Sequence, residues 1–191
     1  GELAGLPELA AFTDLATRRR TSLLIDRERP VPDELVHRLC RLATWAPNHK
    51  RTWPWRFAAL TGAARAKLGE AFADDMAARH FGDEGKRDKT RTKYLRTPTV
   101  LVVAASNHDD ELFAVENQYA VAAGLQNLLL GATALGLATF WGSPALPDSP
   151  SVLALCGFEP TDRLVGVVYV GWQARTVEIP QRPPAVVHHI S

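Results

Sequence analysis

The stretch WAPNHKRTWPWRF, residues 45–57, joins a predicted amphipathic helix to a predicted strand and is the most informative part of the chain. Pro47 and Pro54 fix the backbone and remove two hydrogen-bond donors. The polar side chains from Asn48 to Arg51 offer donors in a row. Such a loop can hold an anion or a polar heterocycle in place, although a simple connection closed by two buried tryptophans fits the composition equally well.

The overall composition limits the classes of function. A chain of 191 residues suits one domain with a substantial core, and we predict a single domain over residues 1–191. Its 22 Lys and Arg against 21 Asp and Glu argue against a nucleic-acid or membrane-surface binder. Cys40 and Cys156 are predicted to be small core residues, not a disulfide or a metal site. No apolar run is long enough to span a bilayer and no secretory signal opens the chain, so we expect a cytoplasmic protein.

The periodicity of apolar residues predicts alternating helices and strands on both sides of the opening stretch. The expected helices cover residues 7–19, 32–46, 62–79, 111–137 and 149–157, and the expected strands cover 56–60, 99–105, 139–141 and 164–171. Residues 80–96 are mostly charged, which favours a solvated helix or a mobile flap over a specific anion site. The helix at 111–137 is apolar nearly all round, so it must be buried on more than one side, and a second subunit is one candidate for the second side.

Most familiar chemical motifs are absent from the sequence. There is no phosphate-binding Gly-rich loop and no nucleophile elbow. The six histidines show no metal-ligand spacing, and His188 and His189 are expected to be solvated, so no metal site is predicted. No nucleophile has a base beside it, and no catalytic side chain is predicted. If the protein is an enzyme, a cofactor carries the difficult chemistry.

Several motifs, each weak alone, occur in an informative order. Arg-Arg-Thr ends the first helix, Ala-Pro-x-His-Lys precedes Pro-Trp-x-Phe, the long apolar helix ends in Ala-x-x-Leu-Gly, and a Trp-x-Ser turn follows. Over residues 9–184 this order resembles the flavin-dependent nitroreductase family, in particular its short, minimal branch. The resemblance implies an α+β fold with a central, mainly antiparallel sheet flanked by helices, in an intertwined homodimer. It also implies one FMN in each of two interface clefts, NAD(P)H as hydride donor, and ping-pong transfer to nitroaromatic, quinone or related small conjugated acceptors.

The family pattern assigns Arg19, Arg20 and Thr21 to the FMN phosphate and ribityl chain. Guanidinium forks match phosphate geometry and a hydroxyl adds a donor. Because three arginines are consecutive, Arg18 is an alternative to Arg20, and a helix C-terminus that favours cations is another explanation for the cluster. The same pattern predicts that Trp45 and His49 reach the flavin from the partner subunit.

The remaining assignments concern the isoalloxazine and the tail. The resemblance implies that one edge of the cofactor meets Gly131, Ala134, Leu135 and Gly136. Against the ring system it implies Trp141, Gly142 and Ser143, with the last two amides donating to the redox-active nitrogen. Arg182 resembles the phosphate-binding arginine of the broader family.

The chain departs from the family pattern at Trp45, Arg51 and Gly142, so two other interpretations stay open. In the first, the protein binds flavin but carries out a specific biosynthetic or dehalogenating reaction. In the second, it is a dimeric binding module that has lost flavin. The charged segment 81–96 is the expected specificity element in the flavin-binding cases.

Overall fold

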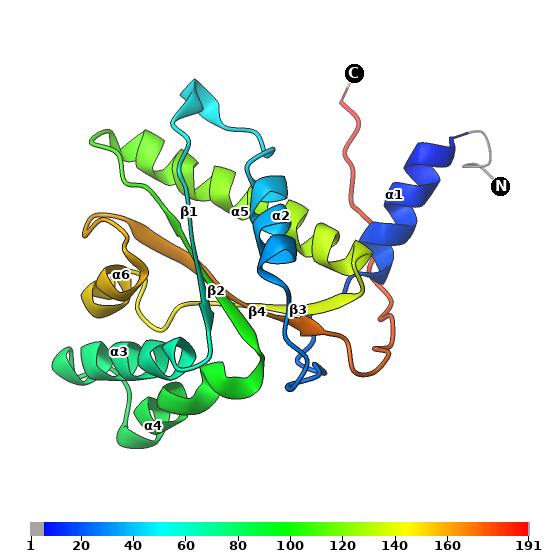
Figure 1. The fold of residues 1–191 in the computed structure, drawn as a ribbon. Helices are drawn as coiled ribbons and strands as arrows, with labels where there is room; N and C mark the ends of the chain where they lie inside the picture. The colour runs from blue at the N-terminus through cyan, green and yellow to red at the C-terminus, as the bar shows by residue number, and fades with distance from the viewer. Residues whose placement is uncertain (1–5, 191) are drawn as a thin grey trace.

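The computed structural model describes residues 6–190 and contains six α-helices and four strands within that range (Figure 1). The helices are α1 Pro7–Arg18, α2 Asp33–Ala43, α3 Ala64–Ala78, α4 Glu84–Lys93, α5 Glu111–Ala134 and α6 Pro150–Cys156. The strands are β1 Trp55–Thr61, β2 Thr99–Ala105, β3 Leu137–Gly142 and β4 Arg163–Trp172. Two short 3₁₀ segments, η1 His49–Arg51 and η2 Tyr94–Arg96, complete the described elements.

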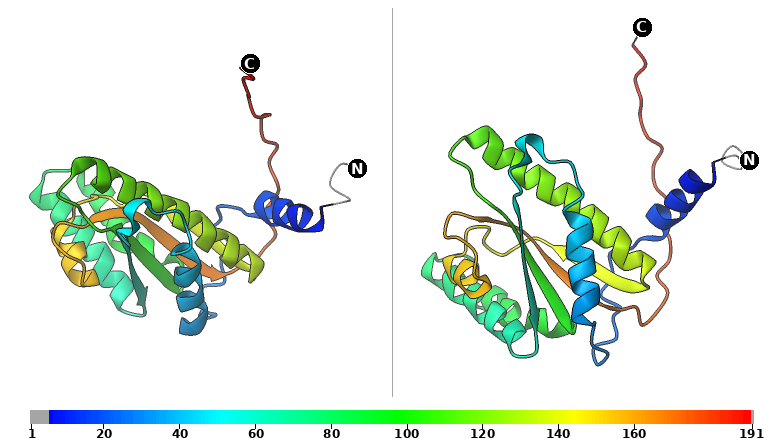
Figure 2. Two further views of the ribbon diagram at one scale, coloured as in Figure 1. Left: turned by 90° about the horizontal axis from the view of Figure 1, so that it is seen from above. Right: turned by 45° about the horizontal axis from the view of Figure 1, so that its top comes forward.

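The four strands form one sheet in the order β1-β2-β4-β3, and every neighbouring pair is antiparallel. This arrangement confirms the predicted α+β fold with a mainly antiparallel sheet. Strand β2 is buried along its whole length, as its continuous apolar sequence predicted. One face of the sheet is covered by α2 and α5, and the other by α3, α4 and α6 (Figures 1 and 2).

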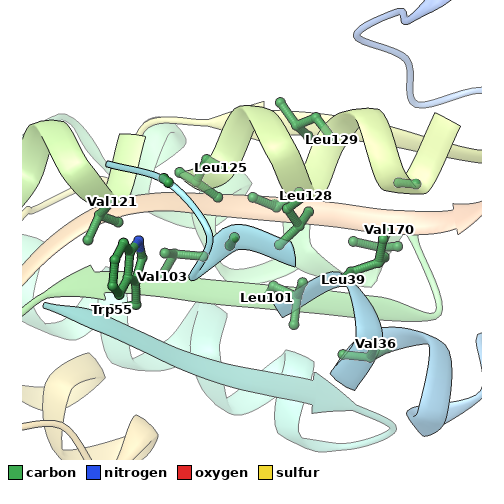
Figure 3. Close-up of a cluster of buried hydrophobic side chains, with 14 of the residues drawn as sticks. Val36, Leu39, Trp55, Leu101, Val103, Val121, Leu125, Leu128, Leu129 and Val170 are labelled. Atoms are coloured by element: carbon green, nitrogen blue, oxygen red, sulfur yellow. The ribbon is translucent and has the colours of Figure 1, made fainter. Parts of the chain in front are cut away.

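The core under α5 positions the loop at 45–57. Trp55 of β1 lies with Leu101, Val103, Leu125 and Leu128 between the sheet and the two helices above it (Figure 3). Its indole nitrogen donates to the carbonyl of Ala120 at 3.3 Å. The tryptophan therefore anchors the end of the loop to both β1 and α5.

Helices α2 and α5 approach each other closely because α5 carries glycine at the contact. A Cβ atom at Gly124 would lie 2.5 Å from the carbonyl oxygen of Ala43, and one at Gly131 would lie 2.5 Å from Cδ1 of Leu42. A side chain at Gly124 would require a shift of the α2 backbone, whereas one at Gly131 would require the Leu42 side chain to move.

Some boundaries and contacts differ from the sequence-based expectations. Helix α5 ends at Ala134 instead of residue 137, because Gly136 adopts φ +76° and the chain turns directly into β3. The expectation that two tryptophans are buried at the end of the loop is wrong for Trp53, which is 61% exposed. Much of the apolar face of α1 is also exposed, including Leu9 and Phe12, since α1 extends away from the sheet and its contact is with α5 (Figure 2).

The charged segment takes the form of a helix held against α3. A Cβ atom at Gly69 of α3 would overlap the carbonyl oxygen of Arg91, so the two backbones are in contact. The Arg91 side chain pairs with Glu70 and with Asp74, which belong to α3. Of the two predicted forms, solvated helix or flap, the structure contains the helix, with its outer face exposed.

No helix within residues 6–190 combines the length and the apolar character needed to cross a bilayer.

Candidate functional site

The chain after α1 is fixed along the edge of the sheet. Thr21 pairs with Thr139 of β3 in a parallel bridge, and the Ser22 amide donates to the Thr139 carbonyl at 2.9 Å. Four residues later Ile25 pairs with Gln173, at the start of the C-terminal tail. The segment that follows α1 therefore lies beside both β3 and the tail, although these parts are far apart in the sequence.

One cavity at this edge brings together four residues that the sequence analysis selected. The arginine cavity, as we call it, has a volume of about 380 Å³. Its lining consists of Arg19, Arg20, Thr21, Val177, Glu178, Pro180 and Arg182. Three guanidinium groups and one hydroxyl thus face a space whose lining contains a single carboxylate.

The arginine cavity carries uncompensated positive charge. Burial lowers the pKa of Arg19, and the neighbouring charges of Arg20 and Arg182 lower it further. The Arg20 guanidinium donates to the carbonyls of Arg19 and Thr17, but its Nε is buried without a partner among the described residues. An anion with several acceptor oxygens would satisfy these groups, so the donor set fits a phosphate.

Arg18, the alternative in the consecutive run, faces elsewhere. Its Nε pairs with Asp14 on α1 at 3.3 Å. Arg18 lines an adjoining cavity of about 270 Å³, which also includes Arg20 and Gly136. Because Arg20 belongs to both linings, the two cavities adjoin, and only Arg19 and Arg20 of the run contact the arginine cavity.

A second cavity lies farther along β3 and has aromatic walls. We call it the tyrosine cavity; it has a volume of about 270 Å³. Its lining consists of Leu23, Lys93, Tyr94, Arg96, Phe140, Gly142, Ser143, Val167 and Tyr169. The Tyr169 ring stacks on Tyr94 with a centroid distance of 5.9 Å and meets Phe140 edge-on at 5.8 Å.

The arginine and tyrosine cavities lie along the same segment of chain, because Arg19, Arg20 and Thr21 line the first and Leu23 lines the second. From Thr139, beside Thr21, to Gly142 the strand advances by about 10 Å at the usual rise per residue. The arrangement suits an elongated ligand with an anionic end and a flat, polar, aromatic end.

Other residues selected from the sequence do not line these cavities. The indole of Trp141 covers Gly166 of β4, so close that a Cβ atom there would overlap it. Gly131 lies against α2, whereas Ala134 and Leu135 are exposed at the end of α5.

Trp45 and His49 lie outside the linings of the arginine and tyrosine cavities. Trp45 is 83% exposed, and Nδ1 of His49 lies 2.6 Å from Oε2 of Glu116 near the start of α5. The His49 ring also meets Phe113 edge-on. Neither residue reaches the arginine or the tyrosine cavity of its own chain, and the family pattern assigns both to the site of a partner subunit.

The loop that carries His49 is held in an unusual backbone conformation. Lys50, Arg51 and Trp53 have φ values of 56°, 55° and 50°, which non-glycine residues rarely adopt. The Asn48 side chain stabilises the turn by accepting from the Trp53 amide and donating to the Thr52 hydroxyl, both at 2.9 Å. Strained loops of this kind cluster at functional sites.

Sequence reasoning gives no role to the aromatic rings of the tyrosine cavity. Lys93 and Arg96 belong to the charged segment 81–96 that is expected to set specificity, but the sequence does not distinguish them from the other cations of that segment. One signal was available, because residues 89–98 contain four basic residues and no acidic one, directly before a buried strand. No group of His, Cys, Asp and Glu side chains within residues 6–190 is arranged to hold a metal ion.

Comparisons with known proteins agree with this geometry. The sequence model described as "Nitroreductase family" matches residues 16–172. The Escherichia coli K12 protein named "Putative NAD(P)H nitroreductase YdjA" is 26% identical over 180 residues, covering 92% of this chain and 97% of its own. The structure of a nitroreductase-like family protein from Bacillus cereus superposes with a TM-score of 0.77 at 28% identity and 90% coverage of both chains. A nitroreductase with bound FMN from Bacteroides fragilis has the same fold, with a TM-score of 0.72 at 21% identity, covering 94% of this chain and 98% of its own.

Proposed function

The chain belongs to the nitroreductase family, and we propose that it is an FMN-dependent NAD(P)H oxidoreductase that works as a homodimer. The observation that carries this proposal is the arginine cavity. Arg19, Arg20 and Arg182 face one another there with little compensating negative charge. A phosphate monoester supplies that charge and the acceptor oxygens, and Thr21 adds a hydroxyl donor.

The tyrosine cavity holds the ring system in this proposal. The backbone amides of Gly142 and Ser143 are the donors that we assign to the redox-active flavin nitrogen, where they stabilise negative charge on reduction. Leu23 and Tyr169 provide apolar and aromatic walls. With FMN bound, a hydride passes from NAD(P)H to the cofactor and, after the oxidised nicotinamide leaves, to the acceptor.

No side chain of this chain is assigned as an essential acid or base. Burial raises the pKa of Tyr169 to about 12 and also raises that of Tyr94, so both hydroxyls stay protonated at neutral pH. The protons that balance the reduction come from water. Nitroaromatic, quinone-like and other small conjugated molecules are the acceptors that we propose.

The homodimer is supported by apolar surface that a single chain leaves exposed. Leu9 and Phe12 of α1 are exposed, as are Val115 and Tyr119 of α5. The tail beyond β4 extends away from the rest of the chain and exposes Val186, Val187 and Ile190 (Figures 1 and 2). Surfaces of this kind mark protein contacts, and a partner subunit in that position also brings its Trp45 and His49 to the flavin.

The test is an absorption spectrum of the purified protein, recorded as isolated and after anaerobic addition of NADPH or NADH to separate samples. We expect a flavin spectrum that bleaches with at least one nicotinamide. A colourless protein that also fails to take up added FMN overturns the proposal and favours a dimeric binding module. A flavin that bleaches but turns over no nitroaromatic or quinone acceptor indicates a specific biosynthetic or dehalogenating reaction instead.

A further inference from the structure

Two cations of the tyrosine cavity have no acidic partner. Lys93 is the last residue of α4 and Arg96 the last of η2, and both line the cavity. Neither forms an ion pair with any residue between 6 and 190. Arg91, two residues before Lys93 in the same helix, pairs with three carboxylates. The contrast indicates that acids are available to α4 but are not placed at the cavity.

The charge of Lys93 is also partly removed from water. Burial is the main cause that lowers the pKa of Lys93, and the neighbouring charges of Arg96 and Lys86 lower it further. The Lys93 ammonium lies 5.0 Å from the centroid of the Tyr94 ring, a weak substitute for an anion. A carboxylate between Lys93 and Arg96 would therefore relieve both the desolvation and the repulsion.

Tyr94 supplies a third group without a partner. The residue is 1% exposed, it lines the cavity, and its hydroxyl forms no hydrogen bond with the described residues. Buried hydroxyls nearly always have a partner, and one that has none in the protein indicates a place for water or a ligand. One hydroxyl and two cations in the lining of the same cavity form a donor set that suits an oxygen anion.

A purely structural explanation accounts for only part of this arrangement. A lysine in the last turn of α4 interacts favourably with the helix dipole. That interaction does not explain why Lys93 is buried, and it does not apply to Arg96, which lies beyond the helix. It also does not explain why the Tyr94 hydroxyl has no partner. The common property of the three groups is that they line one cavity and would each bind an anion.

We propose that Lys93, Arg96 and the Tyr94 hydroxyl form a carboxylate-binding subsite, so that the preferred acceptors are conjugated or aromatic carboxylates. The carboxylate binds to Lys93 and Arg96 in the lining of the tyrosine cavity, and the conjugated system lies over the face of the flavin ring that the same cavity holds beside Gly142 and Ser143. A carboxylate suits the subsite better than a phosphate, because the arginine cavity already offers the guanidinium groups that a phosphate prefers. The inference rests on the proposed function, since it names the substrate class of that site.

The experiment compares two acceptors that differ in charge, 4-nitrobenzoate and 4-nitrobenzamide, in the FMN-loaded protein. In each two-electron turnover NAD(P)H gives a hydride and solvent gives a proton, the nitro group loses one oxygen as water, and a nitroso product forms. We expect kcat/KM to favour the benzoate by about tenfold or more, as charge-assisted hydrogen bonds predict. In Lys93→Gln with Arg96→Gln that preference disappears, so that kcat/KM for the benzoate falls by about tenfold more than kcat/KM for the benzamide.

The matched control is Lys67→Gln with Lys89→Gln. These lysines are exposed on α3 and α4 outside both cavities, and their substitution removes the same net charge. The control should keep the preference for the benzoate. Loss of the preference in the control as well would show that overall charge, and not the subsite, selects the acceptor, and would overturn the proposal.

Binding without turnover separates this inference from the proposed function. Calorimetric titration with benzoate and with benzamide needs no redox activity, and Tyr94→Phe removes only the hydroxyl. Benzoate should bind more tightly than benzamide to the parent protein, and severalfold more weakly to the Phe variant. Equal binding of the two ligands overturns the subsite.

If the Lys93 and Arg96 substitutions reduce turnover of both acceptors equally, the cations act on the cofactor and the subsite is also overturned. If neither acceptor is reduced but benzoate still binds selectively, the proposed function fails and the subsite stands.

Discussion

Arg19 and Arg20 have different surroundings although they are neighbours of the same type. Arg19 is repelled by Arg20 and Arg182, and Arg20 keeps a buried Nε without a partner. Arg19→Ala combined with Arg20→Ala removes charge-assisted contacts to a phosphate worth roughly 1.5–3 kcal/mol each. We expect FMN affinity to fall by about 100-fold or more, measured by fluorescence titration of the apoprotein with FMN.

The comparison for this double variant is Lys67→Ala with Lys89→Ala, which removes two exposed cations far from the arginine cavity. FMN affinity should then be nearly unchanged. An Arg19 and Arg20 variant that still binds FMN as tightly as the parent protein contradicts the phosphate assignment.

The two thiols give a prediction about pH. Burial raises the pKa of Cys40 to about 11 and that of Cys156 to about 12. A raised pKa means that the folded state holds the thiol protons more tightly than the unfolded state does. The free energy of unfolding therefore begins to fall as pH rises past about 8.5, the pKa of an unperturbed thiol, and it continues to fall until the pH reaches the thiol pKa values of the folded state.

At pH 8 both thiols should react with iodoacetamide far more slowly in the native protein than in urea, measured by mass spectrometry. Equal rates in the two states would contradict the burial argument.

Single residues also mark the limit of prediction from sequence. Arg19, Thr21 and Arg182 could be selected only through the order of the family's motifs, because the bridge that brings α1, β3 and the tail together is a tertiary contact. Arg91 and Lys93 look equivalent in the sequence, yet the first pairs with carboxylates of α3 and the second faces a cavity. Local periodicity contains no information about which cation has a partner.

At the scale of elements, the strands were predictable because they are buried runs of apolar residues. Strand β2 is buried on both faces and matches its predicted bounds, and the ends of the other elements shift by a few residues. The packing of α4 on α3 was not predictable, because it depends on Gly69 at a backbone contact and not on an apolar face. In α1 the periodicity is misleading in the other direction: it predicts a buried apolar face, but no residue of α1 is buried within one chain.

Helices α3 and α6 are connected through one buried carboxylate. Asp75 of α3 accepts from the Ser149 hydroxyl, and from the hydroxyl and amide of Ser151 at 2.6 and 3.0 Å. Asp75→Ala leaves these donors without a partner at the start of α6, so we expect the free energy of unfolding to fall by about 2–4 kcal/mol. Urea denaturation followed by circular dichroism measures the change. Asp74→Ala, on the exposed side of the same helix, is the control and should have little effect. Similar losses for both variants would contradict a specific role for Asp75.

At the scale of the whole molecule, the exposed features lie on several elements that one chain does not bring together. The apolar residues of α1, α5 and the tail that are exposed are not covered by other described residues, and neither Trp45 nor His49 lines the arginine or the tyrosine cavity. In the dimer that we propose, a second copy of the chain would cover the apolar surface and complete the two cavities. Such a dimer would account for the long helix α5 being apolar on more sides than the sheet can bury.

This reasoning predicts that dimer formation and FMN binding are lost together. Val115 and Tyr119 lie four residues apart on the exposed side of α5, 41% and 68% exposed. Val115→Asp with Tyr119→Asp puts two charges into the proposed interface, which should weaken dimerisation by about 100-fold or more. Light scattering after size exclusion measures the mass, and absorbance measures the flavin content of the same peak.

The control is Leu155→Asp, which places a charge on α6 at the other face of the sheet. This variant should leave both the mass and the flavin content unchanged. A charged α5 variant that remains a flavin-containing dimer would show that this side of α5 is not the interface, and the assignment of Trp45 and His49 to a partner's site would have to be abandoned with it.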